Sequence, residues 1–193
     1  MKILAFSDLH GSEKAVRGIE KKAGKAEILL CAGDFTYFEQ RIRKVLRKLN
    51  SLGKKVLLVH GNHEVPADVA ASAKDMKNII YIHKKVYREG NYVFVGHGGE
   101  GFATASKDFE KFAAKLRFKK GEKIILVTHQ PPHKTKLDFI WAHHGNKSYR
   151  KFIAKKRPVL AVCGHLHETA GMEDKLGRTR LINAGDKGVF VEI

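Results

Sequence analysis

The sequence predicts an α/β protein, and two observations carry this prediction. Short apolar runs alternate with helical patterns three times within the first 76 residues, which is typical of βαβ units around a parallel sheet. Beyond them, short strand-like runs follow one another without helices between, which indicates antiparallel pairing as well. A chain of 193 residues is long enough for one sizeable core and short for two, so we expect a single domain over residues 1–193.

Three buried strands are predicted in the first part of the chain, at the aliphatic runs 2–6, 27–32 and 56–60. The helix after the first strand begins after Ser12, whose hydroxyl can cap it, and ends at Gly24. A second helix is expected over residues 38–52, where apolar residues recur at helical spacing, and a third over residues 66–76. The basic residues of the second helix are interpreted as a solvated face: Arg41, Arg43, Lys44, Arg47 and Lys48.

The second part of the chain mixes strands, hairpins and two helices. The runs 86–89 and 92–95 flank Gly90-Asn91, a two-residue turn signal, and are expected to form an antiparallel hairpin. Helices are predicted after Ser106 and over residues 148–156. Further strands are predicted at 79–82, 123–127, 159–163 and 189–193, and a pair at 169–173 and 178–182. Residues 96–101 and 133–147 show no regular period and are expected to be functional loops.

The composition is that of an ordinary globular protein, with 43% hydrophobic and 30% charged residues, which excludes disordered and membrane classes. No run is long enough for a signal peptide or a spanning helix, so we expect a cytoplasmic protein without a membrane partner. The net charge of +17 attracts phosphate-bearing partners. Because no basic and aromatic interleaving is apparent, a solvated surface is favoured over a nucleic-acid groove. Cys31 and Cys163 are expected to be buried thiols.

Polar clusters follow five of the apolar runs directly. They are Asp8-Leu9-His10-Gly11, Gly33-Asp34, Gly61-Asn62-His63-Glu64, Thr128-His129-Gln130 and Gly164-His165-Leu166-His167. Each cluster alone is explained as well by a helix cap or a hydrogen-bonded structural residue. Together they are more specific, because neighbouring strands can bring all of them to one edge of a sheet, where open α/β sheets bind ligands.

With these five motifs in this order, the sequence resembles the calcineurin-like metallophosphoesterases over nearly its whole length. The resemblance implies two facing mixed β-sheets flanked by helices, a four-layer α/β/β/α sandwich. It also implies a dinuclear metal centre that hydrolyses phosphate esters by in-line attack of a metal-bridging hydroxide. Carried over by residue, Asp8, His10 and His167 bind one ion, Asn62, His129 and His165 bind the other, and Asp34 bridges both. His63 matches the catalytic histidine of the family.

The residue types fit that assignment chemically. Carboxylate, imidazole and amide ligands suit divalent ions, and we expect two of them, Mn²⁺ first, with Fe, Zn²⁺ or Ni²⁺ as alternatives. Two such ions lower the pKa of a shared water and stabilise phosphoryl charge, but they supply no proton for the leaving alkoxide. His63, next to Asn62 and not needed as a ligand, is expected to be that general acid. Glu64 either orients the His63 ring or is an exposed carboxylate at a helix start.

We therefore expect a metal-dependent phosphoesterase. The resemblance implies action on phosphodiesters, because compact family members with His at the His63 position include phosphodiesterases. Within enzymes the alternatives are a nuclease or a phosphomonoesterase, and outside them an interaction scaffold that has kept the fold and lost turnover. The substrate, the native metal and the oligomeric state are not fixed by the sequence. Among the other histidines, His60 is expected to be packed and His83 solvent-facing, and four on loops are candidates for substrate contact: His97, His133, His143 and His144. Asn183 follows a strand and either helps to shape the site or, as we favour, has a turn role.

Overall fold

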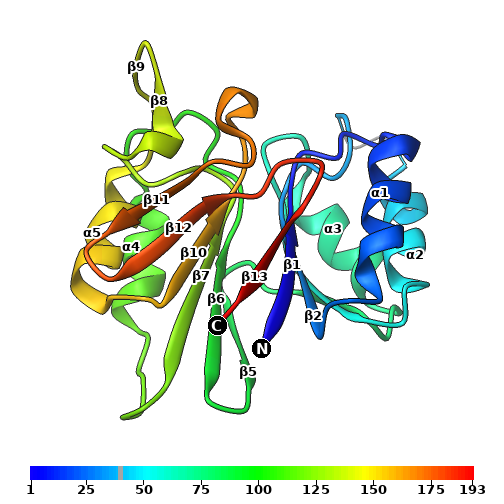
Figure 1. The fold of residues 1–193 in the computed structure, drawn as a ribbon, viewed down its shortest axis with the longest axis horizontal. Coiled ribbons are helices and arrows are strands. Elements are labelled where there is room, and N and C mark those ends of the chain that lie inside the picture. Colours follow the sequence, from blue (N-terminus) through cyan, green and yellow to red (C-terminus); the bar gives the residue numbers. More distant parts are fainter. Residues whose placement is uncertain (39–40) are drawn as a thin grey trace.

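Two β-sheets pack face to face, and helices cover the outer face of each, in a computed structural model that describes residues 1–38 and 41–193 (Figure 1). One sheet has five strands in the order β13-β1-β2-β3-β4. The other has six, in the order β11-β12-β10-β7-β6-β5. The expected four-layer α/β/β/α sandwich is confirmed.

The five-stranded sheet is built from the first part of the chain and its last strand. Four strands run parallel, namely β1 (Lys2–Phe6), β2 (Ile28–Ala32), β3 (Lys55–Val59) and β4 (Ile79–Tyr81). The final strand, β13 (Val189–Glu192), pairs antiparallel with β1. Three helices cover the outer face: α1 (Glu13–Ala23), α2 (Ile42–Asn50) and α3 (Pro66–Ala73).

The six-stranded sheet is mixed. Its parallel strands are β6 (Tyr92–His97), β7 (Lys123–Thr128), β10 (Leu160–Cys163) and β12 (Thr179–Asn183). Two antiparallel strands form its edges, β5 (Lys85–Glu89) beside β6 and β11 (Glu173–Leu176) beside β12. The outer face is covered by α4 (Lys107–Ala114) and α5 (Lys147–Lys156). The β5–β6 pair is the hairpin expected around Gly90-Asn91.

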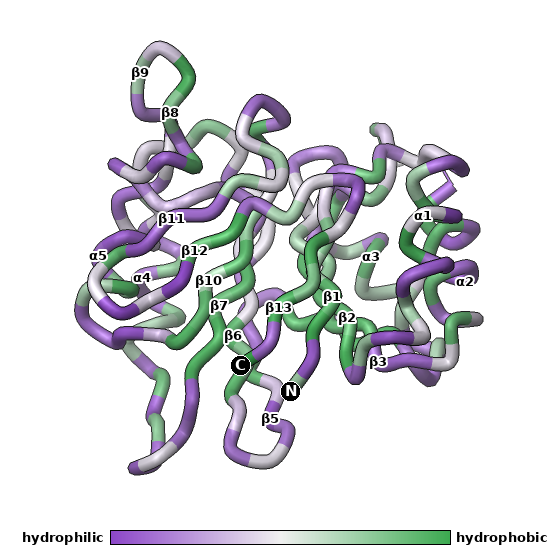
Figure 2. The backbone as a smooth tube through the Cα atoms, viewed as in Figure 1, coloured by the Kyte–Doolittle hydropathy of each residue, from purple (hydrophilic) through white to green (hydrophobic). Residues whose placement is uncertain are grey.

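The central strands are buried on both faces because successive side chains of a strand point to opposite sides. In β1, Ile3 and Ala5 pack between the two sheets, whereas Leu4 and Phe6 pack under the helices. From the opposite sheet, Phe94 of β6 enters the layer between the sheets and is fully buried. Figure 2 accordingly shows hydrophobic residues along the central strands of both sheets. This continuous core fixes the two sheets relative to each other.

Local signals placed most helix ends correctly. Ser12 and Ser106 cap α1 and α4 by accepting hydrogen bonds from the third residue that follows each. The helix expected over 38–52 is observed as α2, and residues 39–40 lie outside the described part of the chain. Among the described residues, no helix combines the length and apolar character that a bilayer crossing requires.

Two sequence expectations fail in the second sheet. The segment 133–147 is not an irregular loop, because it contains a short 3-10 helix, Lys136–Asp138, and two short strands, β8 (Phe139–Ile140) and β9 (Ala142–His143). Residues 169–173 do not form a strand with 178–182. The chain makes a 3-10 turn at His167–Thr169 instead, and the hairpin begins at Glu173. The hydroxyl of Thr169 donates to the carbonyl of Leu137, which holds this turn against the neighbouring 3-10 helix.

Candidate metal centre

Five strands deliver the candidate ligands: β1, β2 and β3 of one sheet and β7 and β10 of the other. The carboxyl ends of these strands lie at the same end of the two facing sheets (Figure 1). The loops that follow them therefore meet across the gap between the sheets. Direct hydrogen bonds cross it, such as that from the His165 amide to the Asp8 carboxylate.

One group of candidate ligands gathers at β1 and β10. Asp8, His10 and His167 each present a ligand atom within 4.8 Å of the others. Nε2 of His10 lies 3.0 Å from Nε2 of His167, and that atom of His167 lies 3.8 Å from Oδ1 of Asp8. His167 is far from Asp8 and His10 in sequence, so only the meeting of the two sheets brings it to them.

A second group gathers at β2, β3, β7 and β10. Asp34, His129 and His165 meet the same distance criterion. Nε2 of His129 lies 3.3 Å from Oδ2 of Asp34 and 3.0 Å from Oδ1 of Asn62. Asp34 also forms a group with His10 and His63, so its carboxylate stands between the two sets of ligand atoms. All seven residues that the sequence predicts as ligands are thus gathered in one place.

The side chains present fit a pair of divalent ions. Nε2 of His165 and Nδ1 of His10 are buried and have no hydrogen-bond partner among the described residues, and buried polar atoms of this kind require one. Burial lowers the pKa of His165 to about 3 and lowers the pKa of His10 as well. Both imidazoles are therefore neutral, which is the form that binds metals.

Asp34 and His129 form a buried ion pair in the absence of a metal. Burial opposes charge on both, but their hydrogen bond and mutual attraction prevail. They lower the pKa of Asp34 to about 2 and raise the pKa of His129 to about 9. The ion pair keeps Asp34 as a carboxylate. To bind a cation through Nε2, His129 would have to lose that proton.

The backbone around the ligands adopts conformations that are rare for residues with side chains. Asp8, His10, Asp34 and His165 all have φ between 44° and 73°, in the left-handed region. Such strain is concentrated at functional sites. A Cβ at Gly61 would overlap the carboxylate of Asp34, so glycine is required there for the close approach of the two loops.

Glu64 has a role that differs from both sequence interpretations. It is buried, with 5% exposure, and its carboxylate accepts hydrogen bonds from backbone amides of Gly61 (2.8 Å), Asp34 (3.1 Å) and Thr36 (2.8 Å). It therefore ties the Asp34 loop to the Gly61 turn and is neither exposed nor bonded to the His63 ring. Burial raises the pKa of Glu64. In the sequence, only the position of Glu64 two residues after Asn62 pointed to a role at the site.

His63 stands beside the centre and is partly open to solvent. Its Nε2 lies 3.9 Å from Oδ2 of Asp34, and its side chain is 17% exposed. The ring stacks on Tyr37, with centroids 5.3 Å apart, and Nδ1 accepts a hydrogen bond from the Phe38 amide at 3.4 Å. The Nε2 position thus faces both the candidate ligands and the mouth of the site.

Three further histidines form a packed row away from the ligands. His60 is buried, as expected, and bonds to the Tyr81 hydroxyl. His83 is not solvent-facing, because its ring packs between His60 and His97 and its Nδ1 accepts from the Gly98 amide. His97 is the last residue of β6 and is fully buried, bonded to Tyr149. Burial lowers the pKa of His60 to about 3 and of His83 to about 4.

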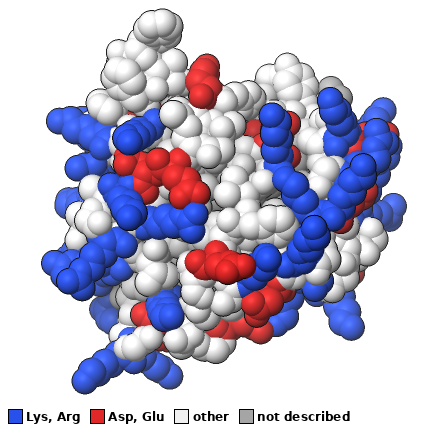
Figure 3. Space-filling model, viewed as in Figure 1, with Lys and Arg blue, Asp and Glu red and all other residues white. Residues whose placement is uncertain are grey.

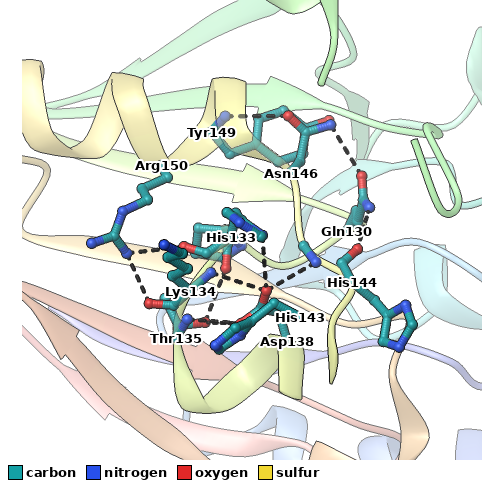
Figure 4. A network of polar contacts seen from close by, with 12 residues as sticks. Gln130, His133, Lys134, Thr135, Asp138, His143, His144, Asn146, Tyr149 and Arg150 are labelled. Atoms are coloured by element: carbon teal, nitrogen blue, oxygen red, sulfur yellow. Dashed lines mark hydrogen bonds and ion pairs between the residues drawn. The ribbon is translucent and has the colours of Figure 1, made fainter. Parts of the chain in front are cut away.

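In the segment 133–147, His143 and His144 make local hydrogen bonds, whereas the buried Nδ1 of His133 has no hydrogen-bond partner among the described residues. Asp138 accepts hydrogen bonds from the Thr135 amide at 2.7 Å and from Nδ1 of His143 at 2.8 Å, and Nδ1 of His133 lies 3.5 Å away (Figure 4). Nε2 of His144 bonds to the carbonyl of Ile140. These side chains order their own segment and are not among the candidate ligands.

Two features that sequence reasoning missed complete the site. Tyr37, Phe38 and Phe102 are exposed aromatic side chains at its mouth, and the ring of Phe102 lies 4.5 Å from that of His165. Phe102 follows residues 98–101, and Gly101 lies beside Asn62. Gly96 and His97, which the sequence places in the same loop, are the last residues of β6. Asn183 is at the end of β12 and not in a turn. Its side chain donates to the carbonyl of Leu166 and thereby supports the loop that carries His165 and His167.

Comparison with known proteins agrees with this geometry. Residues 1–169 match the model of the calcineurin-like phosphoesterases, and the chain belongs to that family. Its members use divalent metals, and membership supports assignment as a hydrolase. An uncharacterized protein of Methanocaldococcus jannaschii, MJ1162, is 33% identical over 205 residues, which cover 99% of this chain and 91% of that protein.

Solved structures show the same fold. TT1561 of Thermus thermophilus superposes with a TM-score of 0.79 at 18% identity, covering 96% of this chain and 89% of that one. A structure described as a novel archaeal phosphodiesterase superposes with a TM-score of 0.57 at 16% identity, covering 96% of this chain and 84% of that one. Both similarities lie in the fold, because identity is low.

Proposed function

We propose that this protein is a phosphodiesterase that depends on two divalent metal ions. Asp8, His10 and His167 would hold one ion, Asn62, His129 and His165 the other, and Asp34 would bridge them. One observation carries the proposal, namely that these side chains converge from five strand ends in two sheets around the Asp34 carboxylate. Mn²⁺ is our first choice of ion, since the ligands are carboxylate, imidazole and amide without thiolate.

When bound, the ions supply a water of lowered pKa and positive charge for the phosphoryl oxygens. The protein itself supplies the proton for the leaving group. The proton would come from Nε2 of the imidazolium form of His63, the atom nearest Asp34, and its transfer would leave a neutral ring. Stacking on Tyr37 fixes the orientation of the His63 ring. His63 is thus placed to protonate the leaving alkoxide as a general acid.

The preference for diesters is supported by the two aromatic sides of the mouth. Tyr37 and Phe38 lie beside His63, and Phe102 lies against His165 on the other side. A diester carries an organic group on each side of its phosphorus, and each group would contact one of these apolar surfaces. A monoester would use only one of them.

A panel of substrates tests this function. The protein is stripped with a chelator, reloaded separately with Mn²⁺, Fe²⁺, Zn²⁺ and Ni²⁺, and assayed on bis(p-nitrophenyl) phosphate, p-nitrophenyl phosphate, cyclic nucleotides and single-stranded DNA. We expect Mn²⁺ to support the highest kcat/KM on a diester, and Asp34→Asn to abolish it. Faster hydrolysis of p-nitrophenyl phosphate would identify a monoesterase. A protein that binds two ions but hydrolyses nothing would point to a scaffold.

A further inference from the structure

A pocket of about 210 Å³ opens beside the candidate metal centre, between α1 and α2. Its wall next to the centre is formed by His10 and Tyr37. The remaining wall carries charged side chains of the two helices and their ends: Glu13, Arg41, Lys44 and Lys48. The basic face of α2, interpreted from the sequence as merely solvated, is therefore divided. Three of its cations line this pocket, whereas Arg43 and Arg47 do not.

The charge of the pocket favours an anion. Three cations face one carboxylate, and that carboxylate is shared, since Glu13 lies 3.4 Å from the ammonium of Lys44 and 3.5 Å from that of Lys48. These lysines lower the pKa of Glu13. Figure 3 shows Lys and Arg side chains gathered over α1 and α2 at the right of the molecule. One carboxylate leaves a surplus of positive charge for a bound ligand.

The pocket lies on the side of the centre where the leaving group would depart. The ring centroid of His63 is 4.9 Å from that of His10 and 5.3 Å from that of Tyr37, the two residues that form the pocket wall. Since a general acid must be within reach of the leaving oxygen, the group attached to that oxygen would extend past His63 toward this wall.

We propose that this pocket binds a second phosphate, carried by the leaving group of the substrate. The inference rests on the proposed function and narrows it to phosphodiesters whose leaving alcohol is itself phosphorylated, as in a nucleotide chain. Lys44 and Lys48 would exchange Glu13 for the substrate phosphate, and Arg41 would add a planar donor suited to phosphate oxygens. Tyr37, 51% exposed, offers a ring for stacking beside it.

The test compares a thymidine dinucleotide with the same dinucleotide carrying a terminal 5′- or 3′-phosphate, using the Mn²⁺-loaded protein. We expect kcat/KM to be higher for one of the phosphorylated isomers. In Lys44→Ala/Lys48→Ala the ratio of kcat/KM between that isomer and the plain dinucleotide should fall about tenfold. The matched control is Arg43→Ala/Arg47→Ala, which removes the same charge at the same spacing from the same helix outside the pocket, and should leave the ratio within about twofold.

A variant that should change the kcat/KM ratio in the opposite direction strengthens the test. Glu13→Gln releases both lysines from their carboxylate, so we expect the ratio to rise about twofold to fivefold. A purely structural role of the Glu13 contacts would not raise it. Binding of thymidine 3′,5′-bisphosphate relative to thymidine 5′-phosphate, measured by calorimetry, should change in the same directions in all three variants.

The outcomes separate this inference from the function on which it rests. One outcome is that the protein hydrolyses the dinucleotides while the ratio of kcat/KM between the phosphorylated and plain substrates falls equally in both double variants. That result would show general attraction by net charge and would overturn the proposed phosphate pocket. A ratio that stays unchanged in all variants would overturn it as well. If the wild-type protein hydrolyses no diester at all, the proposed function fails and this inference fails with it.

Discussion

At the scale of single residues, the proposed metal ligands and the proposed general acid differ in where their ring nitrogens point. His10, His129 and His165 direct ring nitrogens at one another or at Asp34 and are shielded from solvent to different degrees. His63 is adjacent to the same carboxylate but presents its Nε2 at the mouth. Its distance from Asp34 would also allow it to bind a metal, so its role requires a direct test.

Replacement of His63 by alanine should separate the two roles. We expect His63→Ala to retain two metal ions per chain and to lose about 10²- to 10⁴-fold in kcat on diesters with an alkoxide leaving group. The loss should be smaller with p-nitrophenolate, which leaves without a proton. Metal content is measured by elemental analysis, with His144→Ala as a control. Parallel loss of metal and activity would show that His63 is a ligand.

His129 makes the stability of the metal-free protein depend on pH. Its pKa is raised to about 9 in the folded state by Asp34, against burial, and is about 6.5 in the unfolded chain. A raised pKa contributes stability that is complete below pH 6.5 and is lost as pH rises through 9. We therefore expect the free energy of unfolding to fall by about 1–3 kcal/mol between these values.

Urea denaturation of chelator-treated protein at intervals between pH 6 and 9.5 measures this effect. Burial lowers the pKa of His10, and lowers the pKa of both His60 and His165 to about 3, so none of these three accounts for a loss of stability as the pH rises through 9. His129→Gln should give a flatter profile. A wild-type profile as flat as that of the variant would contradict the ion pair between His129 and Asp34.

At the scale of elements, the segment between β7 and α5 is ordered by one buried carboxylate. Asp138 accepts from the amides of Lys134, Thr135 and Gly145 and from the ring of His143 (Figure 4). These hydrogen bonds supplement the short antiparallel pairing of β8 with β9. They also explain why a stretch without hydrophobic period is structured, which sequence periodicity does not detect.

Asp138→Asn should loosen this segment. The asparagine amide keeps one acceptor oxygen, but its NH₂ group would face N–H groups that now donate to the second carboxylate oxygen. We therefore expect the free energy of unfolding to fall by about 2 kcal/mol. Hydrogen exchange should increase first in the amides of residues 134–146. Asp75→Asn, at an exposed turn, serves as control. Equal exchange in the two variants would show that Asp138 does not hold the segment.

At the scale of the whole molecule, the candidate metal centre joins two sheets that otherwise meet through their apolar faces. The ligands from β1, β2 and β3 lie on one side and those from β7 and β10 on the other. Ions bound between them would favour the folded state over the unfolded state, because the ligands converge only in the folded chain.

Removal of metal should therefore lower the melting temperature. Mn²⁺ at about 100 times its Kd adds about 2.7 kcal/mol per site, which corresponds to about 5–10 °C for a chain of this size. Calorimetry with and without a chelator measures this difference. Asp34→Asn, which removes the carboxylate common to both sites, should lose most of the gain. A variant that melts with the full metal-dependent increase would argue against a bridging Asp34.

The sequence by itself determined the order of the elements, because strand and helix periodicity and the serine caps at Ser12 and Ser106 are local properties. It also showed which polar side chains follow the strands, and the resemblance of these motifs to the calcineurin-like family implied the seven candidate ligands. Tertiary structure decided the roles of the residues around the candidate ligands. Burial made Glu64 a backbone anchor and enclosed His97, and His83 packs its ring against His97. The approach of α1 to α2 made a pocket from part of a solvated face. The physical reason is that burial and charge pairing depend on contacts between residues far apart in the chain, whereas propensity and periodicity depend only on near neighbours.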